Sequence, residues 1–225
     1  MNIAFVTRFD VNDRNARSGV PYSMFHALSK KYNVTWVNCS FPQTRFDGWI
    51  NFLFDQKIRS FFQFFGQTFS LYNPIICWFT SRNLKKQLTK INYDIIISTE
   101  TEAFPFLKQD KPIFIRTDKI FPSTINYTIF GMPRIFEIIS KILEIKTLKN
   151  ITYLLAASNW MLDESKKYYS SSIQKKIKLV ETGANFDDDK ISYHKRIYNK
   201  KKLSLLFIGS FAQKKGVNIA FDTMN

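Results

Sequence analysis

The chain has 225 residues, 45% of them hydrophobic, which is enough apolar material for at least one sizeable core. Charged residues make up 23% and are interspersed with apolar ones, which argues against long disordered regions. The formal net charge of +15 fits nucleic acid, anionic lipid headgroups or phosphate-bearing small molecules, but no nucleic-acid recognition motif accompanies it, so we expect no nucleic acid partner.

Short apolar runs typical of buried strands alternate with segments of helical period. The strand-like runs are, in chain order, Ile3–Thr7, Val34–Val37, Tyr93–Ser98, Pro112–Arg116, Tyr153–Ala157 and Ile177–Glu181. The helix-like segments between them are Pro21–Lys31, Asn83–Lys90, Met132–Lys149 and Asn159–Tyr169. This alternation predicts an α/β fold, a Rossmann-like doubly wound parallel sheet, in which ligands bind outside the carboxyl ends of the strands.

A change of composition predicts a domain boundary after residue 186. Residues 187–202 are polar and basic, include the run HKRIYNKKK and lack an apolar period, so we interpret them as a basic linker. A new buried strand begins at Leu203, and residues 203–225 add a loop and a partial helix that starts after Gly216. We therefore expect a first domain at 1–186 and an incomplete second Rossmann-like domain at 203–225.

The uncharged stretch between Arg59 and Arg82 raises the question of a membrane span, but Gln, Ser, Asn and Pro residues interrupt it. We expect instead an aromatic face that lies against the domain or on a membrane surface. Cys39 and Cys77 are far apart in apolar segments, and the start MNIAFVTRFD is typical of a strand rather than a targeting segment. The sequence thus predicts a cytoplasmic protein, with peripheral association with the inner face of the membrane left open.

Two loops suit an anion or a sugar. In the first, RSGVPYSM, Ser18 can cap the next helix, Gly19 allows close approach of a ligand to the backbone, and Pro21 is tolerated in the first turn. The second, GSFAQKKG, lies between a strand and a helix, whose free N–H groups and macrodipole favour a phosphate. Its expected contact residues are Gly209, Ser210 and Lys215. Ordinary helix capping is the simpler alternative for the first loop, and a plain turn explains the second as well.

Carboxylates follow two of the expected strands. Asp118 lies at the end of Pro112–Arg116, where it can accept a hydrogen bond from an acceptor hydroxyl or hold a donor sugar. Alternatively, it caps the next segment or pairs with Arg116 or Lys119. Glu100 and Glu102, in the segment STETEAF, have the same two interpretations.

Acidic and histidine residues do not indicate a metal site. Asp187, Asp188 and Asp189 resemble the D-x-D signature of metal-dependent sugar-nucleotide transferases, but their place at the start of the linker favours a solvated turn. His26 and His194 lack neighbouring ligands, so neither a zinc site nor a Ser–His–Asp triad is indicated. We predict no metal and no bound cofactor.

Together, these segments resemble the retaining family 4 glycosyltransferases of the GT-B fold, in which two Rossmann-like domains face each other across the active site. RNARSGVPYSMFHALSK is similar to that family's first-loop motif, which commonly ends S-G-T-P-Y. TDKIFPSTINY resembles the T/S-D-A-T-F segment of one branch, LLAASNWMLDESKKYY its strand–Ser–helix element, and ETGANFDD its G-A-N turn. LLFIGSFAQKKGVNIAF resembles the opening of the donor domain. The matches come in family order and span nearly the whole chain.

The resemblance implies transfer of a sugar from a nucleotide-sugar to a glycan or glycolipid acceptor, with retention at the anomeric carbon and without a metal. Gly19 would approach the donor phosphate or sugar, Asp118 would contact the sugar or acceptor near the reacting centre, and Lys215 would stabilise the leaving diphosphate. Charge aimed at a developing anion in a dry cleft contributes about 3–4 kcal/mol. The remaining implied site residues are Gly209 and Ser210 on the donor side, and Ser18, Glu100, Glu102 and Asn185 along the cleft or acceptor side.

The sequence departs from the family pattern in two places. Ser210 stands where many members have Arg, and the acidic segment and nucleotide pocket of the family's second domain have no counterpart in these residues. We expect a fragment of the full enzyme, or a chain that a second polypeptide completes, with little affinity of its own for a nucleotide-sugar. The alternative is a non-catalytic acceptor-domain remnant or subunit.

Overall fold

The computed structural model describes residues 1–40, 72, 74–125, 134–181, 183 and 216–223. The chain divides into two compact units, Met1–Phe186 and Asp187–Asn225. The first unit contains the sheet and is described first. The assignment of the second unit to a donor domain stays a prediction.

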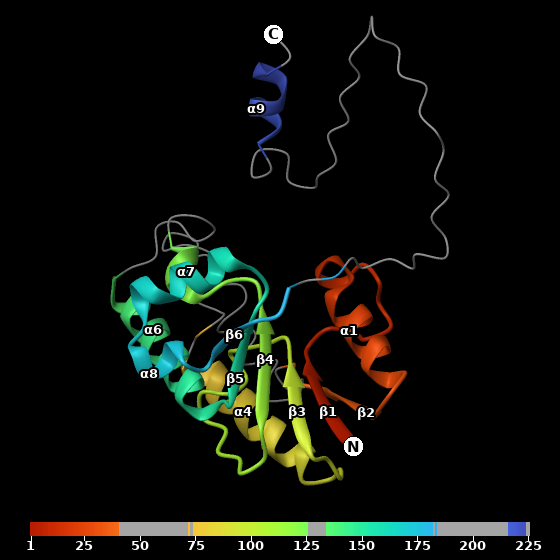
Figure 1. Ribbon diagram of the computed structural model, residues 1–225. Helices are drawn as coiled ribbons and strands as arrows, with labels where there is room; N and C mark the ends of the chain where they lie inside the picture. Colours follow the sequence, from red (N-terminus) through yellow and green to blue (C-terminus); the bar gives the residue numbers. More distant parts are fainter. Residues whose placement is uncertain (41–71, 73, 126–133, 182, 184–215, 224–225) are drawn as a thin grey trace, which may run out of the picture. The chain divides into compact units, whose positions relative to one another are not determined.

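A six-stranded, all-parallel sheet forms the centre of the first unit (Figure 1). Its strands are β1 (Asn2–Thr7), β2 (Asn33–Asn38), β3 (Ile95–Ser98), β4 (Ile113–Thr117), β5 (Tyr153–Ala156) and β6 (Ile177–Leu179). Their spatial order is β2-β1-β3-β4-β5-β6. The chain reverses its direction of travel across the sheet between β1 and β3, and ligands of doubly wound folds bind at such a switch point.

Helices connect most of the strands. They are α1 (Val20–Ser29), α4 (Pro74–Leu88), α5 (Phe121–Thr124), α6 (Arg134–Asn150), α7 (Asn159–Tyr168) and α8 (Ser171–Gln174), and a 3₁₀ turn, η1 (Ala16–Gly19), precedes α1. Ser158 caps α7, because its hydroxyl oxygen accepts a hydrogen bond from the Met161 N–H. At the C-terminal end of α6, the Lys176 ammonium donates to the carbonyl oxygens of Leu148 and Lys149 and to that of Ile151, which follows the helix.

The alternation of side chains along the strands gives the sheet two packed faces. On one face, Phe5 of β1 meets Phe25 of α1 with ring centroids 5.8 Å apart. On the other, Ala4 and Val6 belong to the main core, which the apolar sides of α4, α6 and α7 complete. Right-handed crossovers produce this arrangement, since the chain leaves β1 in one direction and returns from β2 in the other. A smaller cluster packs beside the main core and consists of Tyr72, Cys77, Phe121 and Leu143.

The structure confirms an α/β fold and all six strands expected in the first unit, each within about two residues at either end. The prediction for α4 was wrong at its start, because the helix begins at Pro74 rather than Asn83 and includes the last part of the uncharged stretch. The sequence analysis missed η1, α5 and α8, which are single turns too short to give a periodic signal. The strand expected at 203–208 lies outside the described residues.

In the second unit, the structure describes a short helix, α9 (Val217–Asp222), which Gly216 precedes with a φ of 74°. Its start confirms the expected role of Gly216, because a left-handed residue at this position favours glycine. Ile219 and Phe221 are exposed. Among the helices described in either unit, none combines the length and apolar character needed to cross a membrane.

Candidate functional site

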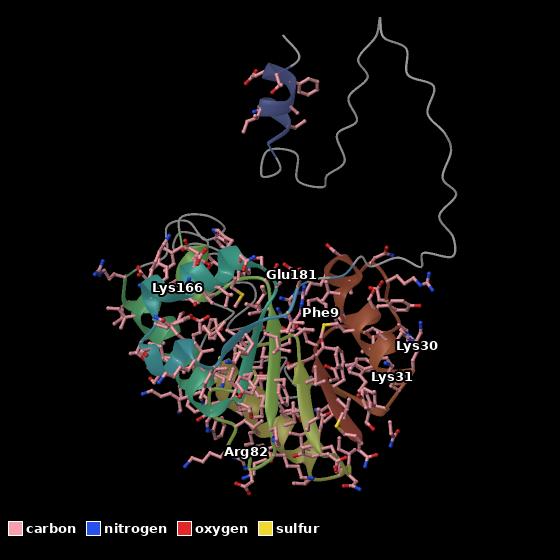
Figure 2. The ribbon with its side chains drawn as sticks, in the orientation of Figure 1. Phe9, Lys30, Lys31, Arg82, Lys166 and Glu181 are labelled. Carbon is pink, nitrogen blue, oxygen red and sulfur yellow. The ribbon has the colours of Figure 1, made fainter. Side chains whose placement is uncertain are left out.

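A pocket of about 500 Å³ opens at the carboxyl ends of β1, β3 and β4. Figure 2 labels Phe9, one of its lining residues, near the ends of the strand arrows. Residues that follow β1 and β3 form one side, and the loop from β4 into α5 forms another. The pocket therefore lies at the switch point of the sheet, where the fold itself predicts a ligand site.

Charged side chains from β1 and β3 form a compact network beside this pocket. Arg8 follows β1 and holds two carboxylates: its Nε lies 3.3 Å from Glu100 Oε2, and its Nη1 lies 3.1 Å from Glu102 Oε1. Glu100 is 2% exposed, whereas the Arg8 side chain is 41% exposed. Burial of an unpaired carboxylate is very costly, and the contacts with Arg8 offset part of that cost for both glutamates.

Arg17 joins the same network from the loop before α1. Its Nη1 donates to the Thr99 carbonyl oxygen at 2.5 Å and lies 3.4 Å from Glu100 Oε1, while its Nη2 lies 3.7 Å from Asp118 Oδ1. This guanidinium thus links the ends of β3 and β4. The contacts of Arg17 help to hold the strained backbone of this loop, in which Arg17, Ser18 and Gly19 adopt φ values of 48°, 57° and 76°.

The carboxyl group of Glu100 is difficult to ionise in this setting. Burial raises its pKa to about 8, and the neighbouring carboxylate of Glu102 adds to the effect, whereas Arg8 and Arg17 act in the opposite direction. The Thr99 hydroxyl also donates to Glu100 Oε1 at 3.2 Å. Glu100 therefore takes up a proton at a higher pH than an ordinary carboxyl group does, in spite of its two arginine contacts.

Asp118 is the exposed carboxylate of the pocket. Its side chain is 63% exposed, and Arg17 is the ion-pair partner described for it. The loop that carries it is fixed by Thr117, whose hydroxyl donates to the Lys119 carbonyl oxygen at 3.0 Å. Asp118 is consequently the acid in this pocket that a ligand reaches most easily.

A second buried acid, Glu144 of α6, also lines the pocket. Its Oε1 accepts the Phe121 N–H at 2.7 Å, and its Oε2 accepts the hydroxyl of Tyr169. Burial raises the pKa of Glu144 to about 7, although both hydrogen bonds favour the ionised form. Glu144 thereby holds the start of α5, which follows the loop with Asp118.

The structure brings together three of the predicted site residues: Glu100, Glu102 and Asp118 all line the pocket. Ser18 and Gly19 do not line it, and the neighbouring Arg17 does so instead. The expected cap by Ser18 was wrong, because Gly19 is the N-cap residue of α1 and Ser18 lies in the left-handed turn before it. Pro21 occupies the first turn as expected.

Asp118 pairs with Arg17, a partner that the sequence analysis did not expect. Arg116, one of the two expected partners, also interacts with the charge of Asp118, which acts to raise the pKa of Arg116. Arg17 reaches Asp118 because η1 carries it to the end of β4, a tertiary contact that sequence spacing does not reveal. The remaining predicted site residues lie outside the described residues: Asn185, Gly209, Ser210 and Lys215.

The sequence analysis missed most of the residues that line the pocket, among them Arg8, Arg17, Tyr72 and Glu144. The first two had an available signal, since Arg8 directly follows a predicted strand and Arg17 precedes the Ser-Gly pair. Glu144 had none, because a glutamate in the middle of a helix is most often a solvated residue. Its burial here depends on Tyr169 and α5, which come from distant parts of the chain.

Within the described ranges, no three histidine, cysteine or acidic side chains lie close enough together to hold a metal ion. His26 packs on the ring of Tyr22 at 4.3 Å rather than near the pocket acids. Cys39 and Cys77 are both buried and form no disulfide. That the protein needs no metal and no cofactor stays a prediction.

Comparison with known proteins adds no identification: no family model matches the sequence, and no curated protein matches it at a significant level.

Proposed function

We propose that the chain provides the acceptor-side half of a retaining glycosyltransferase of the GT-B type, which transfers a sugar from a nucleotide-sugar to a glycan or glycolipid. The observation that carries this proposal is the pocket of about 500 Å³ at the ends of β1, β3 and β4, with its gathered acids and arginines. Its volume is in the range of small-molecule sites, and its place in the sheet is where such folds bind ligands.

The lining of the pocket suits a carbohydrate. A sugar ring presents hydroxyl groups around its edge and apolar C–H groups on its faces, so it needs hydrogen-bonding groups and aromatic walls together. Both kinds of residue line the pocket: the threonines are Thr99, Thr101, Thr117 and Thr124, and the aromatic residues are Phe9, Tyr72 and Phe121. The hydroxyls of Thr99, Thr117 and Thr124 donate hydrogen bonds within the protein, so they would meet a ligand as acceptors. The Tyr72 and Thr101 hydroxyls are 2.6 Å apart, which fixes one aromatic wall.

Asp118 is the residue to which we assign the main contact with the sugar or acceptor. As an exposed carboxylate it accepts hydrogen bonds, and a hydrogen bond between a hydroxyl and a charged group contributes about 1.5–3 kcal/mol. Arg17 places positive charge beside it, where a phosphate of the donor is attracted. The donor contacts of Gly209, Ser210 and Lys215 remain part of the proposal.

A transfer assay tests this function. The full chain is incubated with UDP- and GDP-sugars and a mixture of oligosaccharides and membrane lipids, and release of nucleoside diphosphate and mass of the product are measured. We expect slow turnover, because this chain alone should have little affinity for a nucleotide-sugar, and a further loss of roughly tenfold to a hundredfold in Asp118→Asn, since that change removes the charge and keeps the shape. Asp163→Asn, on the exposed surface of α7, is the matched control. The absence of both turnover and saccharide binding would contradict the proposal.

A second candidate function is a non-catalytic subunit that only binds the acceptor. One observation favours it: every residue that lines the pocket belongs to the first unit. A glycan-binding assay on the same chain separates the two functions, because the subunit binds saccharides at the pocket and releases no nucleoside diphosphate. Loss of glycan binding in Asp118→Asn without any turnover in the unaltered chain would favour this second function.

A further inference from the structure

The outward face of α6 exposes three isoleucines. Ile135 is 59% exposed, Ile138 is 45% exposed and Ile142 is 58% exposed. Spacings of three and four residues place them on the same side of the helix. The helix buries its opposite side, where Ser140, Leu143, Glu144, Thr147 and Leu148 lie. The three exposed isoleucines therefore lie on the side of α6 that faces away from the core.

Two lysines continue the same stripe toward the end of α6. Lys146 lies four residues after Ile142, and Lys149 follows three residues later, so helical geometry places both on the isoleucine side. Both are exposed. We call Ile135, Ile138, Ile142, Lys146 and Lys149 the α6 stripe.

The exposed charges that α6 itself carries are mostly positive. Of the two glutamates in the helix, Glu137 pairs with Lys141 at 2.6 Å and Glu144 is buried. Arg134 adds a further exposed cation at the first residue of the helix. Lys146 also lies over the Phe106 ring at 3.8 Å, which holds its charge close to the helix. An apolar segment and a cationic segment thus follow one another along a single exposed face.

We propose that the α6 stripe docks on an anionic membrane surface, with the isoleucines among the lipid headgroups and acyl chain ends and the lysines on lipid phosphates. An interfacial helix binds through this combination of apolar area and electrostatic attraction. The net charge of +15 complements an anionic leaflet and strengthens the attraction. The inference concerns a different surface from the pocket and does not depend on the proposed sugar transfer.

A bilayer fits the α6 stripe better than nucleic acid does. Protein surfaces that bind single-stranded nucleic acid combine cations with aromatic rings on which bases stack, whereas the protruding side chains here are aliphatic. An anionic bilayer offers apolar and phosphate groups within a few ångströms of depth, so it satisfies both segments together. The occupant to which the proposal commits is therefore a phospholipid surface.

Vesicle co-sedimentation of the full chain tests the proposal. The vesicles are phosphatidylcholine, with or without phosphatidylglycerol, at low and high salt. We expect binding to the vesicles that contain phosphatidylglycerol, weakened by salt because part of the attraction is electrostatic. Ile138→Ser/Ile142→Ser is expected to weaken binding roughly tenfold or more, since each removes apolar area from the membrane contact. Lys146→Glu/Lys149→Glu is expected to have an effect of at least that size.

The matched control is Lys85→Glu/Lys86→Glu on α4, which changes the net charge by the same amount at two other exposed lysines. We expect it to weaken binding by no more than roughly twofold or threefold, as a long-range charge effect. Thermal unfolding of each variant checks that it is folded, and the exposure of all altered side chains makes this the expected result.

Three outcomes would overturn the proposal. The first is no binding of the unaltered chain to anionic vesicles at low salt, which would leave the stripe to a protein partner. The second is that the α4 control variant weakens vesicle binding as much as the α6 lysine variant does, because the attraction would then depend on the net charge of the protein and not on the α6 stripe. The third is unchanged binding of the folded isoleucine variant, because the stripe would then not enter the membrane.

Discussion

Glu144→Gln is expected to make the stability of the protein less dependent on pH. Glutamine has nearly the same shape, and its amide can keep both hydrogen bonds by accepting the Phe121 N–H and donating to the Tyr169 oxygen. It cannot ionise. The substitution therefore removes the titration of one fully buried acid while it leaves the connection between α6 and α5 in place.

The magnitude follows from the pKa of Glu144, which burial raises from about 4.5 to about 7. An acid whose pKa is raised in the folded protein stabilises it fully below the pKa of the unfolded chain, and this contribution is lost as pH rises through the folded pKa. Each pH unit between the two pKa values corresponds to about 1.4 kcal/mol. The unaltered chain should thus lose about 2–3 kcal/mol more than Glu144→Gln between roughly pH 5 and pH 8.

Urea unfolding of both chains at a series of pH values between these limits measures the difference. Glu100 titrates in both chains, so its contribution cancels in the comparison. Glu137→Gln, in the same helix but ion-paired with Lys141 at the surface, is the control and should follow the unaltered chain. Parallel pH curves for the unaltered chain and Glu144→Gln would refute the reasoning, because Glu144 would then ionise as easily in the folded state as in the unfolded state.

Three further predictions concern the parts that hold the site. Gly19→Ala should destabilise the protein by about 1–2 kcal/mol in urea unfolding, since its φ of 76° is costly for a residue with a Cβ; equal stability would show that the loop readily adopts another conformation. Lys176→Met should cost about 1–2 kcal/mol, because three carbonyls near the end of α6 lose their donor, whereas Lys178→Met should change little; equal effects would contradict the capping role. Arg8→Met should raise the pKa of Glu100 above its value of about 8, which carboxyl-carbon NMR titration measures; an unchanged titration would show that Arg8 does not favour the ionised form.

The sheet was predictable because each strand is a short run of mostly apolar residues bounded by polar ones. Ile3–Thr7 illustrates this: the run is buried on both faces, as a central parallel strand requires. The start of α4 was not predictable in the same way. Residues 74–81 have no charged side chain, so the sequence shows little contrast between a buried and an exposed face of the helix there.

The candidate site was predictable to the extent that it depends on the ends of strands. Glu100 and Asp118 each follow a strand, and parallel strands end at one edge of the sheet, so their proximity follows from the fold. Arg8 and Arg17 carried a signal in the sequence, but the acids with which they pair were not predictable. Arg17 reaches the acids through a left-handed turn, and its first two residues, Arg17 and Ser18, are not glycines, so the sequence does not indicate the turn. Glu144 is buried through contacts with Phe121 and Tyr169, which depend on the packed tertiary structure.

The central claim is that the pocket at the ends of β1, β3 and β4 binds carbohydrate. Methyl NMR of threonine-labelled full chain, titrated with monosaccharides and UDP-sugars, tests it directly, because four threonines line the pocket and others lie elsewhere. We predict that the methyl signals of the four pocket threonines shift in a saturable way; these are Thr99, Thr101, Thr117 and Thr124. The methyl signals of Thr89 and Thr152, which do not line the pocket, should change little. Shifts confined to threonines outside the pocket, or no shifts with any of these ligands, would contradict the account.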